Sequence, residues 1–157
     1  MNSQLKSRYV WEYSLNRKKA LEMHEGERAE SPQDVARFLR GLGIQDYEQE
    51  HFLTIILDVK NQIKGFFTVT IGLVDRTQVH AREVFRNAIL QGTSKVILAH
   101  NHPSGDPTPS SHDIDCTKEL VAAGKIIGIE VMDHVILGLP TQSRLRDYLS
   151  FREENLL

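Results

Sequence analysis

The sequence contains a single cysteine, Cys116, which excludes a disulfide framework within the chain. No run approaches the roughly 20 apolar residues of a membrane span, and the amino terminus lacks the apolar core of a signal peptide. A formal net charge of -2 excludes a domain held on phosphate backbones mainly by an excess of basic residues. These absences predict a soluble cytoplasmic protein that does not bind membranes.

The 157 residues are 40% hydrophobic and 25% charged, which suits one compact domain with a small appendage. Residues 1–30 form the appendage, because they hold six Lys or Arg and five Glu among scattered apolar side chains. We expect a flexible arm, or an arm that docks through Tyr9, Val10, Trp11 and Tyr13. Its basic cluster at 17–19 either contacts nucleic acid or, as charge runs usually are, is a solvated surface. Residues 31–157 are the expected folded domain.

Hydrophobic periodicity after Ser31 alternates between helix and strand patterns. Ser31 and Asp34 form a capping box that begins a first helix, which Gly41 and Gly43 end. The later expected elements are helices over 81–89 and 111–124 and strands over 52–57, 66–71, 96–99, 126–137 (one strand or a pair) and 148–151. A hairpin at 58–62 followed by strand–helix alternation predicts a mixed α/β fold, with helices packed against a mixed sheet.

Three of the seven histidines and three of the five prolines lie in one short segment, AHNHPSGDPTPSSHDID. His100 and His102 follow the apolar strand 96–99, and side chains at i and i+2 of a strand end point to the same side. The proline- and glycine-rich residues after them predict a rigid turn back towards this end of the strand. The segment then reaches a helix start at Ser110, with Asp113 in the first turn.

Two imidazoles and one carboxylate match the ligand set of a catalytic zinc site. His100, His102 and Asp113 would supply two nitrogen ligands and one oxygen ligand to Zn²⁺ and leave a fourth position for water. A structural zinc site usually has four protein ligands, often thiolates, which Cys116 alone cannot supply. Ser110 and Asp113 also fit a capping box, and a carboxylate with two oxygens can serve both purposes. The residues therefore predict Zn²⁺ as a cofactor alongside ordinary helix capping.

A zinc hydrolase also needs a base that takes a proton from water. Glu50 directly precedes the apolar strand 52–57, and from there a carboxylate can reach over the end of a neighbouring strand. Glu83 lies on the expected helix 81–89, where it is either the base or a solvated helix residue. The remaining candidates are Glu48, Asp106 and Asp115.

Other residues near the histidines also have ordinary structural interpretations. We expect His112 to be a surface bystander on the first turn of its helix, rather than a transient ligand. Cys116 is expected to be a small packed side chain. Asp133 and His134, near the end of the chain's last long apolar segment, either orient a ligand imidazole or make a hydrogen bond at a strand end.

The spacing of these residues resembles that of a known metalloprotease motif. His100-Asn101-His102, followed by seven residues, Ser110, two residues and Asp113, resembles the JAMM motif of MPN+ (JAB) metalloproteases. The longer string AHNHPSGDPTPS, together with VHAREVFRNAIL and residues 133–136, resembles the RadC family, which was named historically for DNA repair. The resemblance covers residues 48–156 and implies a cytidine-deaminase-like MPN/JAB sandwich, in which helices flank a mixed sheet.

The resemblance also implies a role for each site residue. The family pattern puts zinc on His100, His102 and Asp113 and gives Ser110 the role of hydrogen-bonding the oxyanion. The family's glutamate precedes the first core strand, which in this sequence matches Glu50 by position.

We therefore interpret the chain as a zinc-dependent metallopeptidase-type hydrolase that cleaves a peptide or isopeptide bond of a protein or peptide substrate. The alternative is a non-catalytic or DNA-associated RadC-like module. Intact ligands with an available glutamate favour the enzyme, and the balanced charge disfavours strong DNA binding. Steeply salt-dependent affinity for DNA would favour the module. The sequence leaves open whether the chain forms a homo-oligomer.

Overall fold

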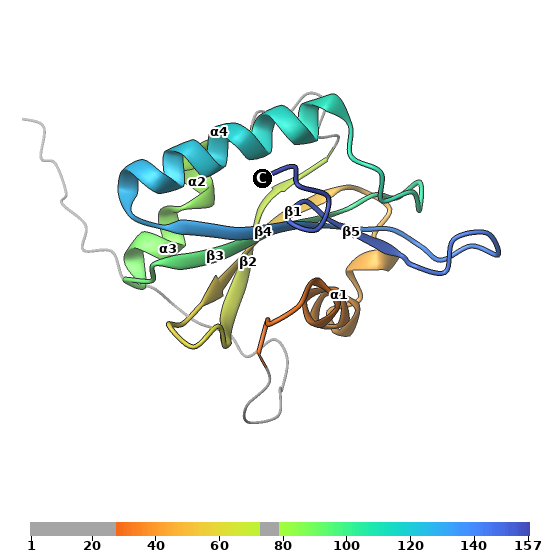
Figure 1. The fold of residues 1–157 in the computed structure, drawn as a ribbon, viewed down its shortest axis with the longest axis horizontal. Coiled ribbons are helices and arrows are strands. Elements are labelled where there is room, and N and C mark those ends of the chain that lie inside the picture. Colours follow the sequence, from red (N-terminus) through yellow and green to blue (C-terminus); the bar gives the residue numbers. More distant parts are fainter. Residues whose placement is uncertain (1–27, 73–78) are drawn as a thin grey trace, which may run out of the picture.

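The computed structural model describes residues 28–72 and 79–157, whose centre is a five-stranded mixed sheet (Figure 1). The strands are β1 (His51–Leu57), β2 (Ile63–Ile71), β3 (Lys95–Asn101), β4 (Glu130–Leu137) and β5 (Tyr148–Ser150). Their order across the sheet is β2-β1-β3-β4-β5. The hairpin expected at 58–62 joins β1 to β2, and the last short strand is present as β5, so both predictions are confirmed.

Strand directions bring the start of β1 and the end of β3 to the same end of the sheet. β1 runs antiparallel to both β2 and β3. β3 and β4 are parallel and are joined by helix α4 (Ser111–Ile127), because a parallel pair needs a crossover connection. The segment that follows β3 and the beginning of α4 therefore lie near the start of β1.

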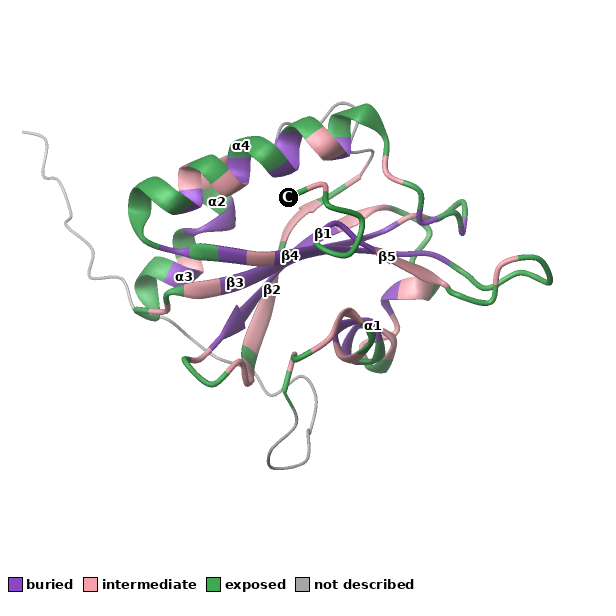
Figure 2. Cartoon of the chain, viewed as in Figure 1, coloured by how far each residue is buried: buried purple, intermediate pink, exposed green. Residues whose placement is uncertain are grey.

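Helices cover both faces of the sheet (Figure 1). One face packs against α1 (Pro32–Gly41) and the short 3₁₀ helix η1 (Ile44–Asp46), and the other against α2 (Ala81–Val84), α3 (Arg86–Leu90) and α4. Burial on both faces explains the nearly continuous apolar runs of β1 and β3, which Figure 2 shows as purple strands. The predicted mixed α/β fold, with helices packed against a sheet, is confirmed.

The two longer helices begin with the same local structure, a serine capping box. Ser31 Oγ accepts a hydrogen bond from the Asp34 amide at 3.2 Å, and the Asp34 carboxylate accepts one from the Ser31 amide at 3.0 Å. In α4 the corresponding distances between Ser110 and Asp113 are 3.1 Å and 2.7 Å. These reciprocal bonds satisfy backbone donors that a helix start leaves unpaired, and they fix the position of Asp113.

The boundaries expected for the helices over 81–89 and 111–124 and for the strand over 126–137 are wrong. The helix expected over 81–89 is divided at Phe85, whose side chain is buried in the core, into α2 and α3. The strand expected from residue 126 starts at Glu130, because α4 continues to Ile127 and ends at Gly128, which has a left-handed φ of 73°. Gly124 does not end the helix. A Cβ at that position would lie 2.4 Å from the Ile129 carbonyl oxygen, so glycine permits the turn into β4.

The arm expected at 1–30 lies outside the described residues except for its last three. The Ala29 amide donates to the Asn61 carbonyl at 2.9 Å, and Arg28 forms a β-bridge with Gln62. The described end of the arm therefore lies against the β1–β2 hairpin. Within residues 28–72 and 79–157, no helix has the length and apolarity that crossing a membrane requires.

Candidate metal centre

The candidate site forms where β3 ends and the chain turns back towards α4. His100 and Asn101 are the last residues of β3, and His102 follows directly. A turn comes next, in which the Gly105 amide donates to the His102 carbonyl at 2.9 Å and Gly105 adopts a left-handed φ of 79°. The loop then reaches α4, whose first turn carries Asp113. The predicted rigid turn thus returns the chain to the strand end.

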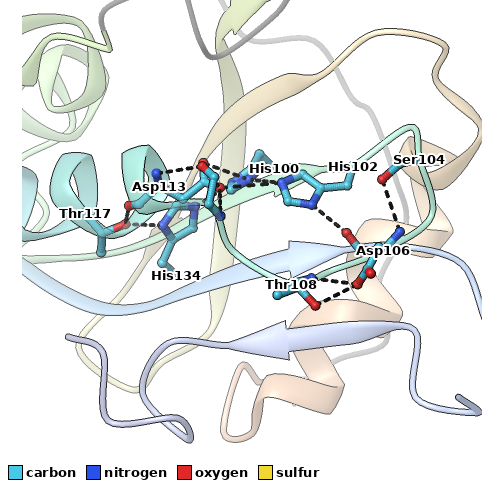
Figure 3. A network of polar contacts seen from close by, with 9 residues as sticks. His100, His102, Ser104, Asp106, Thr108, Asp113, Thr117 and His134 are labelled. Atoms are coloured by element: carbon cyan, nitrogen blue, oxygen red, sulfur yellow. Dashed lines mark hydrogen bonds and ion pairs between the residues drawn. The ribbon is translucent and has the colours of Figure 1, made fainter.

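The structure brings the three predicted ligands together (Figure 3). His100 Nε2 lies 3.0 Å from His102 Nε2 and 3.4 Å from Asp113 Oδ1. His102 Nε2 lies 3.7 Å from Asp113 Oδ2. His100 and Asp113 are buried, with 1% and 4% of their surface exposed, and His102 is partly buried.

This donor set fits a small divalent cation. Tetrahedral coordination at about 2.0–2.2 Å places neighbouring donor atoms roughly 3.3–3.6 Å apart, close to the separations of 3.0 Å, 3.4 Å and 3.7 Å among the three side chains. Imidazole nitrogens and a carboxylate oxygen are also the ligand types that zinc takes in catalytic sites. Within the described part of the chain, His100, His102 and Asp113 form the group suited to holding a metal ion.

Burial and neighbouring charges shift the pKa values of the three side chains. Burial lowers the pKa of His100 to about 3. Burial also acts to lower the pKa of His102, but the nearby Asp113 carboxylate and the hydrogen bond to the Asp106 carbonyl give a net increase. Burial opposes ionisation of Asp113, yet the nearby His102 and His100 and the hydrogen bonds from Ser110 hold its pKa well below the usual range. His100 is therefore neutral and Asp113 ionised at neutral pH, as metal ligation requires.

The tautomer of His102 follows from its second ring nitrogen. His102 Nδ1 lies 2.6 Å from the backbone carbonyl oxygen of Asp106, which can only accept a hydrogen bond. Nδ1 therefore carries the proton, and the neutral ring presents the Nε2 lone pair to the cluster. Arg144 supports this loop by donating to the Gly105 carbonyl at 2.6 Å and pairing with the Asp106 carboxylate at 3.2 Å.

Of the two interpretations offered for Asp133 and His134, contact with a ligand imidazole applies to His134, and a hydrogen bond at a strand end applies to Asp133. His134 Nε2 lies 2.8 Å from His100 Nδ1, so His134 contacts a ligand imidazole. The Asp133 carboxylate instead accepts hydrogen bonds from the Ser150 hydroxyl at 2.6 Å and the Arg152 amide at 3.0 Å. Asp133 thereby ties β4 to the carboxyl-terminal segment.

Glu50 directly precedes β1, at the end of the sheet where β3 ends. Phe52 of β1 pairs with His100 of β3, and this is the last pair of the ladder, so the residues just before β1 and just after β3 lie at the same end of the sheet. Glu50 is partly buried, and its negative charge is among the influences that raise the pKa of His102. The structure therefore places Glu50 beside the ligand cluster.

Asn101 holds the segment that carries Glu50, a role that sequence reasoning missed. Asn101 Oδ1 accepts a hydrogen bond from the His51 amide at 2.8 Å, and Asn101 Nδ2 donates to the Gln49 carbonyl at 3.1 Å. These bonds fix the backbone on both sides of Glu50. The signal in the sequence was an amide side chain directly after an apolar strand, because a buried polar group needs partners.

The other carboxylates considered as a base have different surroundings. Glu83 is exposed on α2, and its carboxylate oxygen Oε1 lies 3.7 Å from a guanidinium nitrogen of Arg82. The carboxylate of Asp106 accepts hydrogen bonds from Thr108 and pairs with Arg144. Glu48 and Asp115 are exposed. Hydrogen bonds from Thr108 lower the pKa of Asp106, and the charges of Arg144 and His102 add to this effect.

Ser110 bonds to one of the ligands. Its hydroxyl donates to Asp113 Oδ2 at 2.7 Å, and its amide donates to the same oxygen at 2.7 Å. If the Ser110 hydroxyl rotates towards a bound substrate, the hydrogen bond from the Ser110 backbone amide still pairs Asp113 Oδ2.

Cys116 is packed on the inner face of α4, as expected, and His112 is exposed. Burial, together with the charges of Glu119 and Asp113, raises the pKa of the Cys116 thiol to about 11. Only about 0.1% of the thiol is then thiolate at pH 8, so we expect the folded protein to react with iodoacetamide far more slowly than free cysteine. Mass spectrometry before and after unfolding in guanidinium measures the difference. Rapid alkylation of the folded protein would contradict this pKa.

A mixed sheet between helices, with a largely buried His-His-Asp cluster at the end of its central strand, is consistent with the JAB/MPN fold. The family model of the RadC-like JAB domain matches residues 29–156, and the chain belongs to this family.

Similar proteins come from several bacteria. The chain is 48% identical over 107 residues to a UPF0758 protein of Desulforamulus reducens, covering 68% of this chain and 47% of that protein. It is 50% identical over 108 residues to a UPF0758 protein of Caldanaerobacter subterraneus subsp. tengcongensis, covering 69% of this chain and 46% of that protein. It is 43% identical over 127 residues to a UPF0758 protein of Desulfitobacterium hafniense, covering 81% of this chain and 53% of that protein. The chain thus spans about half the length of the curated relatives it matches.

Proposed function

We propose that this chain is a zinc-dependent metallopeptidase-type hydrolase that cleaves a peptide or isopeptide bond. The observation that carries the proposal is the convergence of His100, His102 and Asp113 at a buried strand end, with Glu50 near enough for its charge to raise the pKa of His102. Membership of the RadC-like JAB family supports the same class of chemistry. When bound by these three side chains, Zn²⁺ would supply Lewis-acid activation of water and of the substrate carbonyl.

Glu50 would carry the proton in this reaction. Its carboxylate accepts a proton from the attacking water as the new C–O bond forms. The same carboxyl group then gives that proton to the leaving amine nitrogen as the C–N bond breaks, so Glu50 ends the cycle ionised. Its place just before β1, fixed by the hydrogen bonds of Asn101 to the residues on either side, supports this assignment.

Ser110 would stabilise the negative charge that develops on the carbonyl oxygen. Its hydroxyl lies at the start of α4 beside Asp113, and rotation can direct the O–H group towards the substrate. Loss of one such donor typically raises the barrier by about 2.7–4 kcal/mol.

The test is a comparison of zinc content and hydrolysis. We expect the purified 157-residue chain, incubated with Zn²⁺, to bind about one ion at the three-ligand site. The loaded protein should cleave members of a panel of peptide and isopeptide substrates, lose this activity with a chelator and regain it with zinc. An absence of zinc binding would contradict the metal site. Stoichiometric binding without cleavage, including in a proteome-wide cleavage screen, would contradict the hydrolase.

A further inference from the structure

A histidine buried beneath the metal site has no part in the proposed reaction. His134 lies in β4 and is 1% exposed. Both of its ring nitrogens have partners: Nε2 lies 2.8 Å from His100 Nδ1, and Nδ1 lies 2.6 Å from Thr117 Oγ1 (Figure 3). Thr117 is fully buried in α4 and also lies 2.6 Å from the Asp113 carbonyl oxygen. These contacts connect β3, β4 and α4.

The direction of these hydrogen bonds can be derived from Thr117. Its hydroxyl has one proton and two partners, the Asp113 carbonyl and His134 Nδ1. The carbonyl can only accept, so the hydroxyl proton is donated to it. Thr117 Oγ1 must then accept a hydrogen bond from His134, which places a proton on His134 Nδ1.

The same reasoning continues to the metal ligand. With its proton on Nδ1, the neutral ring of His134 has a lone pair on Nε2 and accepts a hydrogen bond from His100 Nδ1. His100 is thereby protonated on Nδ1 and has its lone pair on Nε2. Nε2 is the His100 atom that lies 3.0 Å from His102 Nε2 and 3.4 Å from Asp113 Oδ1.

Aromatic packing keeps the ring of His134 in this orientation. Phe151 stacks on His134, with ring centroids 4.7 Å apart and planes inclined by 24°. Phe52 meets it edge-on at 5.4 Å and also stacks on His100 at 5.9 Å. Two phenyl rings therefore restrict the rotation that would exchange the two nitrogens of His134.

We propose that Thr117 and His134 are positioning residues that set His100 in the Nδ1-protonated tautomer and so prepare its Nε2 atom to bind a metal ion. The hydrogen bonds run from the Asp113 carbonyl through Thr117 and His134 to His100 Nδ1, so they connect two of the three candidate ligands through atoms that do not face the metal. The inference rests on the metal site of the proposed function but not on its substrate or its catalytic steps.

The first test removes only the Thr117 hydroxyl. In Thr117→Val, His134 loses its acceptor and can instead protonate Nε2, which drives the proton of His100 to the nitrogen that should bind metal. We expect zinc affinity, measured by competition with a chromophoric chelator, to fall roughly 10–100-fold, as for other substitutions that remove a partner of a ligand histidine. Thr117→Ser keeps the hydroxyl and should retain or restore most of the affinity.

Thr54→Val is the matched control. Thr54 is fully buried in β1, and its hydroxyl makes no hydrogen bond within the described residues. The same chemical change there should leave zinc affinity unchanged. Equal affinities for Thr117→Val, Thr54→Val and the unsubstituted chain would overturn the proposal. A parallel loss in Thr117→Val and Thr54→Val would also do so, because the effect would then come from general disturbance of the core.

The second test uses the metal-free protein. Long-range ¹H–¹⁵N NMR spectra distinguish the two neutral histidine tautomers, and we expect His100 and His134 to be protonated on Nδ1. In Thr117→Val both rings should shift towards Nε2 protonation. A His100 ring protonated on Nε2 in the unsubstituted protein would refute the proposal. Because this measurement needs no metal or substrate, it can refute the tautomer proposal without refuting the hydrolase proposal. The hydrolase proposal can likewise fail while the tautomer proposal holds.

Discussion

Replacement of Glu50 by glutamine is expected to reduce zinc-dependent hydrolysis by about 10²–10⁴-fold, the usual contribution of general acid–base catalysis. Glutamine has nearly the same shape but cannot accept a proton from water or return it to the leaving amine. Zinc affinity should change little, because Glu50 is not one of the three clustered ligands. Initial rates on the substrate identified by the panel or screen, with zinc content measured on the same samples, check both statements.

Glu83→Gln is the matched control for this experiment, because Glu83 was the alternative base. Glu83 is exposed on α2 beside Arg82, so its substitution should leave both activity and zinc content unchanged. Full activity of Glu50→Gln would remove Glu50 from the mechanism. If Glu83→Gln were the inactive variant, the base would be Glu83, and the inference from strand pairing would be wrong.

Replacement of His102 by alanine is expected to abolish measurable zinc binding at this site. The substitution removes one of three ligands, and the loss should exceed the roughly 10–100-fold cost of removing only a hydrogen-bond partner of a ligand. Zinc at about 100 times its dissociation constant should stabilise the unsubstituted chain by about 2.7 kcal/mol, because the ion binds only the folded form. The His102→Ala variant should show no such stabilisation. Chelator competition and thermal unfolding with and without zinc measure the two effects.

His112→Ala provides the control for a nearby histidine. His112 is exposed on the first turn of α4, and its removal should preserve zinc binding and zinc-dependent stabilisation. A similar loss in His112→Ala would make His112 a ligand and contradict the three-residue site. Retention of tight zinc binding by His102→Ala would show that the ion binds elsewhere.

Local sequence patterns predicted much of the fold. Apolar runs identified β1 and β3, and the capping boxes at Ser31 and Ser110 identified the starts of α1 and α4. The boundaries that failed depended on distant contacts. One predicted helix is interrupted at the buried Phe85, and glycine at position 124, inside another helix, permits the close approach of the Ile129 carbonyl. A periodicity of nearby residues contains no information about such contacts.

The candidate ligands were equally accessible to sequence analysis, because His100, His102 and Asp113 lie within fourteen residues on a strand end, a turn and a helix start. The direction of side chains at i and i+2 and the geometry of a capping box are local properties. The sequence by itself therefore determined which three side chains are the candidate ligands and which class of chemistry they would support.

Only the tertiary structure decided what surrounds these ligands. The pairing of β1 with β3 brings the segment that carries Glu50 to the end of the sheet where His102 lies, and Asn101 fixes the backbone of that segment. The contact of His134 with His100 requires β3 and β4 to be adjacent, although 34 residues separate the two histidines along the chain. Strand pairing and helix packing create these neighbours, and both depend on burying the whole apolar sheet, a property of the complete fold rather than of any one segment.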